Sequence, residues 1–237
     1  MENPKRSAVV TGGTGGLGAA VTQALLENGC KVAIPVTSDR HIADFKQKIG
    51  TLKSQVMTVS TDLTVESEVE NFFQTVIDDL GHVDILANIA GGFFGGVPVA
   101  ETDLEKWDFM MDLNLKATFL CCKAVIPQMI ERRYGKIVNV SARAGLSGIA
   151  GLGAYCASKC GLRVLTESIA EEVKDAGINV NSILPSIIDT PANRKAMPDE
   201  DHSRWVSPSD IAKVILFLTS DDAAIINGAA IPVYGRA

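Results

Sequence analysis

Short apolar runs recur along the chain, and most are followed by turn-forming residues and then by a helical stretch. The runs lie at residues 7–10, 31–36, 56–60, 83–87, 135–140, 179–184 and 229–234. Strands that alternate with helices in this way indicate a parallel sheet built from βαβ units. The pattern therefore predicts an α/β fold, a Rossmann-like doubly wound parallel sheet of about seven strands with helices on both faces.

Two helices and one irregular stretch are expected in the second half of the chain. Thr102 and Glu105 fit a capping box for a long helix that runs toward Ile130, and another helix is expected over 154–176. Residues 186–206 are polar, contain prolines and exceed an ordinary connection in length, so we expect a lid over the ligand cleft. After the lid, Ser207 and Pro208 fit the N-cap and first position of a further helix.

Composition fits one globular domain over residues 1–237. Of the 237 residues, 46% are hydrophobic and 21% are charged, so the chain can bury a substantial core. The formal charge of −6, without a basic stripe, argues against a nucleic-acid partner. No secretory signal or membrane-spanning run is recognised, so we expect a soluble cytoplasmic protein with no membrane contact.

Cysteine and histidine usage gives no sign of a metal site. The five cysteines include no CxxC pair, and the chain has three histidines. We therefore expect reduced thiols and no bound metal.

A glycine-rich turn follows the first apolar run, where residues 11–18 read TGGTGGLG. Glycines at 12, 16 and 18 allow a tight turn and let backbone N–H groups approach a pyrophosphate at the positive end of the next helix. A purely structural turn is the alternative, because glycine-rich turns are common. The flanking strand and helix favour dinucleotide binding.

The end of the second predicted strand bears on the choice between NAD and NADP. An acidic residue there would bond the ribose hydroxyls and repel a 2′-phosphate, but this position is Val36. Thr37 and Arg40 could hold a 2′-phosphate, although Asp39 lies between them and Arg40 could simply face solvent. The sequence therefore predicts NAD(P) and leaves the preference undecided.

Two further strand ends carry candidate ligand contacts. Asp62 could accept a hydrogen bond from the adenine amine or cap the helix that starts near Thr64. Asn88 precedes glycine pairs around Phe93 and Phe94, which suggests backbone close to a ligand with rings that stack on it, or rings that only fill the core. Ligands in doubly wound sheets bind outside the carboxyl ends of the strands, where these residues fall.

The catalytic candidates are Tyr155 and Lys159, which share one helix face because they lie four residues apart. An ammonium group beside a phenol lowers its pKa from the ordinary value of ~10. An ordinary surface pair is the alternative, because YxxxK occurs often by chance. Asn114 lies among apolar residues of the predicted helix, so its amide either bridges backbone or helps to hold a water chain.

Together these residues resemble the short-chain dehydrogenases/reductases along nearly the whole chain. The resemblance implies that the glycine turn holds the pyrophosphate, that Tyr155 is the catalytic acid, that Lys159 binds the ribose and that Asn114 supports a proton-relay water. The catalytic residues it implies are Tyr155, Lys159 and Asn114, and the nearby Ser141 is a further candidate. The cofactor contacts it implies are Gly12, Thr14, Gly16, Leu17, Gly18, Thr37, Arg40, Asp62, Leu63, Asn88, Ala90, Gly91, Tyr155, Lys159, Pro185, Ile188 and Thr190.

One position departs from the family pattern. The family's catalytic serine usually lies thirteen residues before the tyrosine, which here is Ala142, while Ser141 is its neighbour. Neighbouring strand residues point to opposite faces, so Ser141 would need an irregular strand end to substitute. Losing a hydroxyl that holds a carbonyl oxygen can cost on the order of a few kcal/mol of transition-state stabilisation. The departure weakens the interpretation as an ordinary ketone reductase.

Residues 89–96, 184–198 and 203–205 look similar to loops of the quinonoid dihydropteridine reductase branch, which also carries alanine at the serine position. This resemblance predicts hydride transfer to a planar C=N or C=O acceptor, with Tyr155 as proton donor and Phe93, Phe94 and Trp205 around a flat ring. The animal enzyme of that branch has an acidic residue where Val36 stands here.

Two alternatives remain open. One is a carbonyl or 3-oxoacyl-thioester reductase that uses Ser141. The other is a dinucleotide-binding sensor or scaffold without catalysis, against which the retention of Tyr155, Lys159 and Asn114 argues. By resemblance the chain is also expected to form a homodimer or homotetramer through helices near 102–131 and 154–176.

Overall fold

The computed structural model describes residues 6–37 and 42–236, in which seven strands form one sheet. All strand pairs are parallel, in the order β3-β2-β1-β4-β5-β6-β7. The strands are β1 (Ser7–Thr11), β2 (Lys31–Val36), β3 (Val56–Ser60), β4 (Ile85–Asn88), β5 (Gly135–Val140), β6 (Ile178–Pro185) and β7 (Ala230–Val233). The predicted doubly wound sheet is confirmed.

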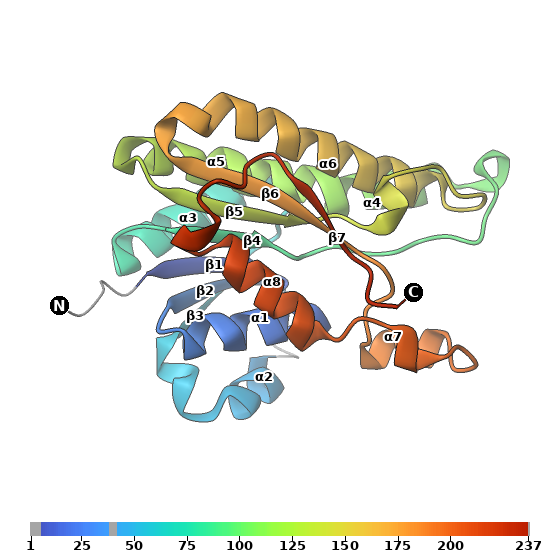
Figure 1. Ribbon diagram of the computed structural model, residues 1–237, viewed down its shortest axis with the longest axis horizontal. Coiled ribbons are helices and arrows are strands. Elements are labelled where there is room, and N and C mark those ends of the chain that lie inside the picture. The colour runs from blue at the N-terminus through green and yellow to red at the C-terminus, as the bar shows by residue number, and fades with distance from the viewer. Residues whose placement is uncertain (1–5, 38–41, 237) are drawn as a thin grey trace.

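Helices cover both faces of the sheet (Figure 1). On one face lie α1 and α8, with α2 beyond them, and on the other lie α3, α4, α5 and α6. The helices are α1 (Gly16–Glu27), α2 (Ile42–Ile49), α3 (Glu66–Leu80), α4 (Leu104–Met111), α5 (Ala117–Arg132), α6 (Gly153–Val173), α7 (Pro191–Ala196) and α8 (Pro208–Leu218). Among these described helices, none is long and apolar enough to cross a lipid bilayer.

Two separate apolar cores follow from the alternation of side chains along each strand. In β1, Ala8 and Val10 join the core under α1 and α8, whereas Val9 joins the core under α3, α5 and α6. All three side chains are fully buried, which explains why the sequence shows continuous apolar runs instead of alternation. The sheet, packed on both faces, carries the loops at its carboxyl edge.

The long helix predicted to run from a capping box at Thr102 toward Ile130 differs from the observed structure in two ways. Asp103 is the N-cap and makes no side-chain capping bond, and the Thr102 hydroxyl donates to the carbonyl of Pro98 instead. The capping-box prediction is therefore wrong, because Thr102 lies one residue before the N-cap. A π-helical turn, Asp112–Lys116, also separates α4 from α5.

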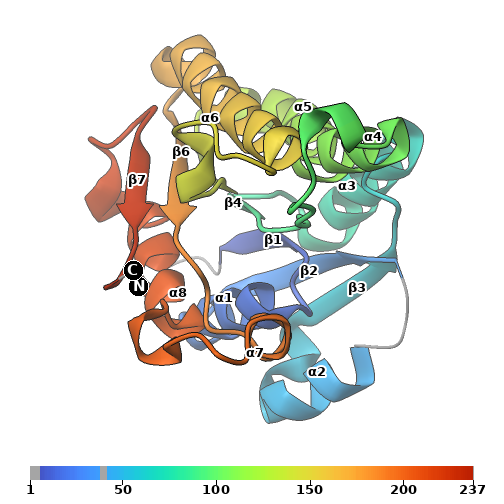
Figure 2. The ribbon, with the colours of Figure 1, turned by 90° about the vertical axis from the view of Figure 1, so that its right-hand side faces the viewer.

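The stretch after β6 is more ordered than expected. Residues 186–206 contain α7 and a short 3₁₀ turn, so the prediction of an irregular segment is wrong there. The predicted start of α8 is confirmed, because Pro208 is its first residue and the Ser207 hydroxyl accepts a hydrogen bond from the N–H of Asp210 at 3.1 Å. Figures 1 and 2 place α7 and the connection from β4 to α4 beyond the same edge of the sheet.

Candidate active site

The candidate site begins where β1 and β4 lie side by side. The strand order reverses at this pair, since β2 and β3 continue beyond β1 and the later strands continue beyond β4. The Thr11 hydroxyl accepts hydrogen bonds from the N–H groups of Ile89 (2.9 Å) and Ala90 (3.0 Å). The turns after the two strands therefore meet at the place where ligands bind in such sheets.

The turn after β1 has no room for extra side chains. Gly12 has φ +65°, and a Cβ there would lie 3.1 Å from the Cα of Ala90. A Cβ at Gly18 would lie 2.0 Å from the carbonyl oxygen of Gly12. The N-cap of α1 is Gly15, which has no side chain to cap the first N–H groups of the helix. This positive helix end fits the pyrophosphate of a dinucleotide.

The segment after β6 reaches back to this turn. A Cβ at Gly16 would lie 2.8 Å from Cγ2 of Thr190, whose hydroxyl caps α7. Pro185 ends β6, and Ile188 forms an isolated parallel bridge with Val206. The structure therefore brings the predicted Thr190 into contact with the predicted Gly16.

Asn114 lies fully buried in the π-helical turn. Its Oδ1 accepts from the N–H of Gly92 at 2.9 Å, and its Nδ2 donates to the carbonyl of Gly92 at 3.2 Å and to Oγ of Ser158 at 3.1 Å. Single π-turns inside helices occur frequently at functional sites. Of the two roles considered for this amide, the bridge to backbone is present, and the water chain stays a prediction.

Lys159 is buried in the same region. Its Nζ donates to the carbonyl of Val140 at 2.8 Å. A Cβ at Gly91 would lie 3.3 Å from this Nζ and 2.8 Å from Oδ1 of Asn114, so Gly91 passes close to both side chains. Burial lowers the pKa of Lys159 to about 8, because desolvation disfavours the charged form.

Tyr155 lies one helical turn before Lys159 and contacts Phe93. The two rings meet edge to face, with centroids 5.0 Å apart and an interplanar angle of 73°. Burial raises the pKa of Tyr155 to about 12, and the thiol of Cys156 adds a smaller effect in the same direction. The predicted net lowering of the Tyr155 pKa is wrong in this arrangement, because the desolvation of the phenol dominates. At neutral pH the phenol keeps its proton.

Ser141 follows β5 directly and is buried. Its hydroxyl donates to the backbone carbonyl of Lys159 at 2.8 Å, and a Cβ at Gly145 would lie 2.9 Å from its Oγ. The hydroxyl is thus enclosed between α6 and the turn after β5. Substitution for the missing serine at Ala142 stays a prediction that this geometry does not support.

Asn88, the last residue of β4, forms a side-chain hydrogen bond to the neighbouring strand β5. Its Nδ2 donates to Oδ1 of Asn139 on β5 at 2.8 Å, and both side chains are buried. Leu63 and Leu17 are also buried, and Leu17 belongs to the core under α1 and α8. The side chains of these predicted cofactor contacts therefore pack inside the protein, and direct contact with a ligand through them stays a prediction.

Asp62 and Thr37 are exposed after β3 and β2. Oδ1 of Asp62 accepts from the hydroxyl (2.7 Å) and the N–H (2.8 Å) of Thr64, and these bonds lower the pKa of the Asp62 carboxyl. Its role as cap of α3 is wrong, since the N-cap of that helix is Val65. The adenine contact stays a prediction. Arg40 lies outside the described residues, together with Asp39.

The aromatic side chains predicted to surround a flat ring lie in two different environments. Phe93 is 66% exposed at the edge of Tyr155, so its ring is accessible to an acceptor. Trp205 is buried and packs on His202 with ring centroids 4.3 Å apart. The expected sandwich of a flat ring between Phe93 and Trp205 therefore has no support from Trp205.

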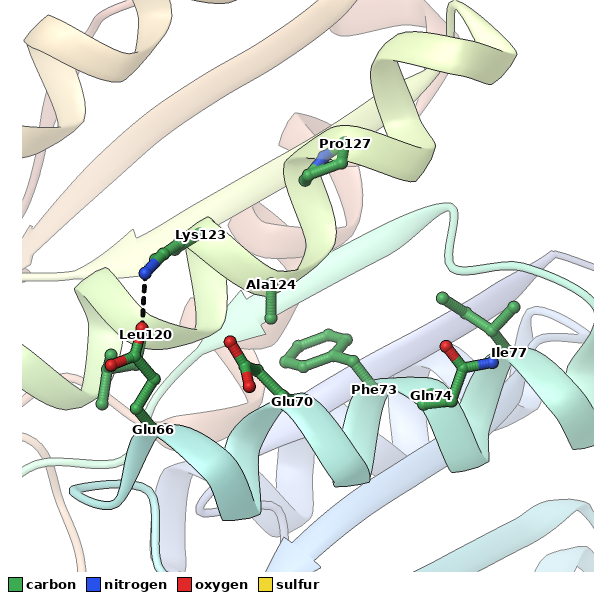
Figure 3. A pocket seen from close by; sticks show the side chains of 9 residues that line it. All are labelled: Glu66, Glu70, Phe73, Gln74, Ile77, Leu120, Lys123, Ala124 and Pro127. Carbon is green, nitrogen blue, oxygen red and sulfur yellow. Dashed lines mark hydrogen bonds and ion pairs between the residues drawn. The ribbon is translucent and has the colours of Figure 1, made fainter.

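A separate hollow of about 360 Å³ lies between α3 and α5 (Figure 3). An ion pair between Glu66 and Lys123 spans the two helices at one end, and Phe73 faces α5. The lining residues are Glu66, Glu70, Phe73, Gln74, Ile77, Leu120, Lys123, Ala124 and Pro127. They include none of the predicted site residues, so the hollow is distinct from the candidate site.

Ser158 is the site residue that sequence reasoning missed. It is fully buried between Tyr155 and Lys159 and bonds to Asn114. A hydroxyl on this helix, flanked by two candidate catalytic residues, was the available signal. Within residues 6–37 and 42–236, no group of three or more His, Cys, Asp or Glu side chains could hold a metal ion.

Comparisons with known proteins agree with this arrangement. A family model described as short chain dehydrogenase matches residues 6–201. The 2,5-dichloro-2,5-cyclohexadiene-1,4-diol dehydrogenase LinX of Sphingobium indicum is 31% identical, over 96% of this chain and 94% of its own. The 3-oxoacyl-[acyl-carrier-protein] reductase FabG of Vibrio cholerae is 32% identical, over 96% and 95%.

Solved structures share the fold closely. The structure of ElxO with NADP bound has a TM-score of 0.93 at 27% identity and covers 98% of both chains. Levodione reductase has a TM-score of 0.89 at 26% identity, over 97% of this chain and 96% of its own. The glycine turn, the partly buried Tyr155 beside the buried Lys159, and these relatives lead to one assignment. The chain belongs to the short-chain dehydrogenase/reductase family of NAD(P)-dependent oxidoreductases.

Proposed function

We propose that this enzyme reduces a planar, conjugated C=N or C=O acceptor and that Tyr155 donates the proton. Two features of the site together carry the proposal. Tyr155 is protonated and partly buried, and the hydroxyl of Ser141, beside Ala142, is already hydrogen-bonded to the backbone carbonyl of Lys159. The first feature supplies an acid, and the second leaves a carbonyl oxygen without its usual hydroxyl partner.

Tyr155 suits the role of acid because burial keeps its phenol protonated at neutral pH. A phenol that is too reluctant to lose its proton is a poor donor, so a nearby cation has to stabilise the phenolate during transfer. Lys159 is the candidate, since it is buried one turn away on the same helix face.

The dinucleotide supplies the hydride when it is bound. The residues that would hold it are Gly12, Gly16 and Gly18 at the pyrophosphate, with Lys159 at the ribose. The N-terminus of α1 supports this assignment, because its N-cap Gly15 has no side chain that could occupy the free N–H groups. Asn114 fixes Gly92 beside the ring of Phe93 and so shapes the wall on which a flat acceptor would lie.

The preference for a conjugated acceptor follows from Ala142. A simple ketone develops charge on one oxygen, and a missing donor there lowers the rate by about 10²–10³. A conjugated imine spreads the developing charge over several atoms and depends less on one hydroxyl. A quinonoid dihydropterin is the test compound of this class.

A 3-oxoacyl thioester is the second candidate acceptor. It is favoured by the relatives, because FabG of Vibrio cholerae and FabG of Thermotoga maritima are 32% and 30% identical to this chain over 96% of its length. The Ser141 geometry argues against it, since that hydroxyl is held by the backbone of Lys159.

The deciding experiment compares the two acceptors side by side. NADH and NADPH are first titrated by fluorescence, and the one that binds is then used with quinonoid dihydropterin and with acetoacetyl thioester. The proposal expects the dihydropterin to give the higher kcat/KM. A higher value for the thioester favours the second candidate, and binding without oxidation by any acceptor favours a sensor.

We also propose that NADPH is accepted, because Val36 offers no carboxylate against a 2′-phosphate and Thr37 is exposed beside it. The lid assignment for residues 186–206 is supported by the contact of Thr190 with Gly16.

A homodimer or homotetramer is supported by exposed Phe119 and Ile130 on α5 and Val164 on α6. A cytoplasmic location is supported by five free cysteines among the described residues. Sedimentation and cell fractionation test these two proposals.

A further inference from the structure

Ser158 joins the helix of Tyr155 to the turn that carries Asn114. Its Oγ donates to the backbone carbonyl of Tyr155 at 2.9 Å and accepts from Nδ2 of Asn114 at 3.1 Å. The residue is fully buried, so neither bond is exchanged for water. The single hydroxyl hydrogen is used by the helix, and the oxygen lone pair is used by the amide.

The amide of Asn114 transmits this contact to the loop after β4. It holds Gly92 by two bonds, one to the N–H at 2.9 Å and one to the carbonyl at 3.2 Å. Gly92 directly precedes Phe93, whose ring meets the ring of Tyr155. Tyr155 is thus linked to the same loop in two ways. Its backbone is connected to Gly92 through Ser158 and Asn114, and its ring contacts the ring of Phe93.

We propose that Ser158 is a positioning residue that fixes the Asn114 amide and thereby holds the loop carrying Phe93 against Tyr155. The proposal rests on the role of Tyr155 as proton donor given above. Ser158 itself does not touch the acceptor. Ser158 determines how closely the loop that carries Phe93 is held to the phenol of Tyr155 during proton transfer.

The need for a hydroxyl at this position follows from the amide's own hydrogen bonds. Asn114 has one acceptor oxygen and two N–H donors, and the two atoms of Gly92 use the oxygen and one N–H. The amide nitrogen also faces Oγ of Ser158 at 3.1 Å and, less closely, Sδ of Met110 at 3.6 Å. Without that oxygen the buried donor keeps only the weak thioether acceptor of Met110, so the amide is held less firmly in the orientation that bonds Gly92.

The same helix contains a matched control. Thr166 is also fully buried, donates to the carbonyl of Leu162 at 2.8 Å and accepts from Nδ2 of Asn139 at 3.0 Å. Its bonds are of the same kind and length as those of Ser158. They tie α6 to β5 instead of the loop after β4, so loss of this hydroxyl should cost stability without moving the loop.

The experiment compares Ser158→Ala with Thr166→Val by hydrogen exchange and kinetics. We expect Ser158→Ala to accelerate exchange in residues 89–97 at least fivefold and to lower kcat about tenfold, with the Kd for the dinucleotide changed less than twofold. Thr166→Val should lower Tm by a similar amount and change neither the loop exchange nor kcat.

Unchanged exchange of residues 89–97 in Ser158→Ala overturns the inference, and so does a kcat loss no larger than that of Thr166→Val. The exchange measurement needs no turnover. If Tyr155→Phe retains full activity, the proposed function fails while the exchange data still decide whether Ser158 holds the loop.

Discussion

The hydroxyl of Ser141 donates a hydrogen bond to the backbone carbonyl of Lys159, across 2.8 Å. The serine next to the usual catalytic position therefore fastens α6 to the end of β5. Its neighbour Ala142 offers only a methyl group. The proposed acid Tyr155 and Lys159 are both present, whereas no free hydroxyl at this position is available for the proposed contact with a ketone oxygen.

Replacing Ala142 with serine should restore that hydroxyl. We expect Ala142→Ser to raise kcat/KM for acetoacetyl thioester at least tenfold, because one more donor would stabilise the developing oxyanion. The value for a conjugated imine should change less than twofold. Parallel steady-state assays test this, and an equal change for both acceptors would contradict the proposed division of substrates.

Tyr155→Phe removes the acid and keeps the ring that meets Phe93. We expect kcat to fall at least 10²-fold, since general acid catalysis contributes this much in typical enzymes. Dinucleotide binding, measured by fluorescence titration, should stay within threefold of the parent. Turnover at the parent rate would remove Tyr155 from the mechanism.

Gly18→Ala should abolish dinucleotide binding and destabilise the fold. Its Cβ would lie 2.0 Å from the carbonyl oxygen of Gly12, a contact that only a backbone shift can relieve. Gly148→Ala is the control, because a Cβ there meets nothing within 4 Å. Titration calorimetry and thermal unfolding of both variants test the prediction, which fails if the two bind equally well.

Stability should depend on pH through Lys159. Its pKa is about 8 in the folded chain and 10.5 ordinarily, so between these values the unfolded chain binds more protons and stability rises with pH. Below pH 8 the ammonium group of Lys159 is charged and buried, and its desolvation lowers the free energy of unfolding by the full amount. Lys159→Met removes this destabilisation.

The difference in unfolding free energy between Lys159→Met and the parent should therefore shrink from pH 7 to pH 9.5, by about 1–3 kcal/mol. Urea unfolding at the two pH values measures it. Tyr155, with a pKa of about 12, contributes the opposite trend only above its ordinary value of 10. A difference that is constant with pH would show that Lys159 is not desolvated.

Apolar runs predicted the sheet well because every central strand is buried on both faces. The expected strand over residues 31–36 has the same bounds as β2, and those over 56–60 and 135–140 match β3 and β5. Capping was harder to predict, since it depends on where the helix starts. Thr102 has the right chemistry but lies outside the first helical turn.

The site was predictable as a set of residues and less so as a set of interactions. Spacing correctly placed Tyr155 and Lys159 on one helix, yet the effect of Lys159 on the phenol could not be read from spacing, because burial decides it. The hydrogen-bond partner of Ser141 could not be predicted from the sequence either. Its bond is to a backbone atom, and backbone partners leave no mark in the sequence.

The methyl of Thr190 already rests on Gly16, at the turn where the pyrophosphate would lie. We propose that the chain segment that carries Thr190 moves away from Gly16 when a dinucleotide enters or leaves. We therefore expect compulsory-order kinetics, in which the dinucleotide arrives first and departs last, and in which its departure limits the turnover rate.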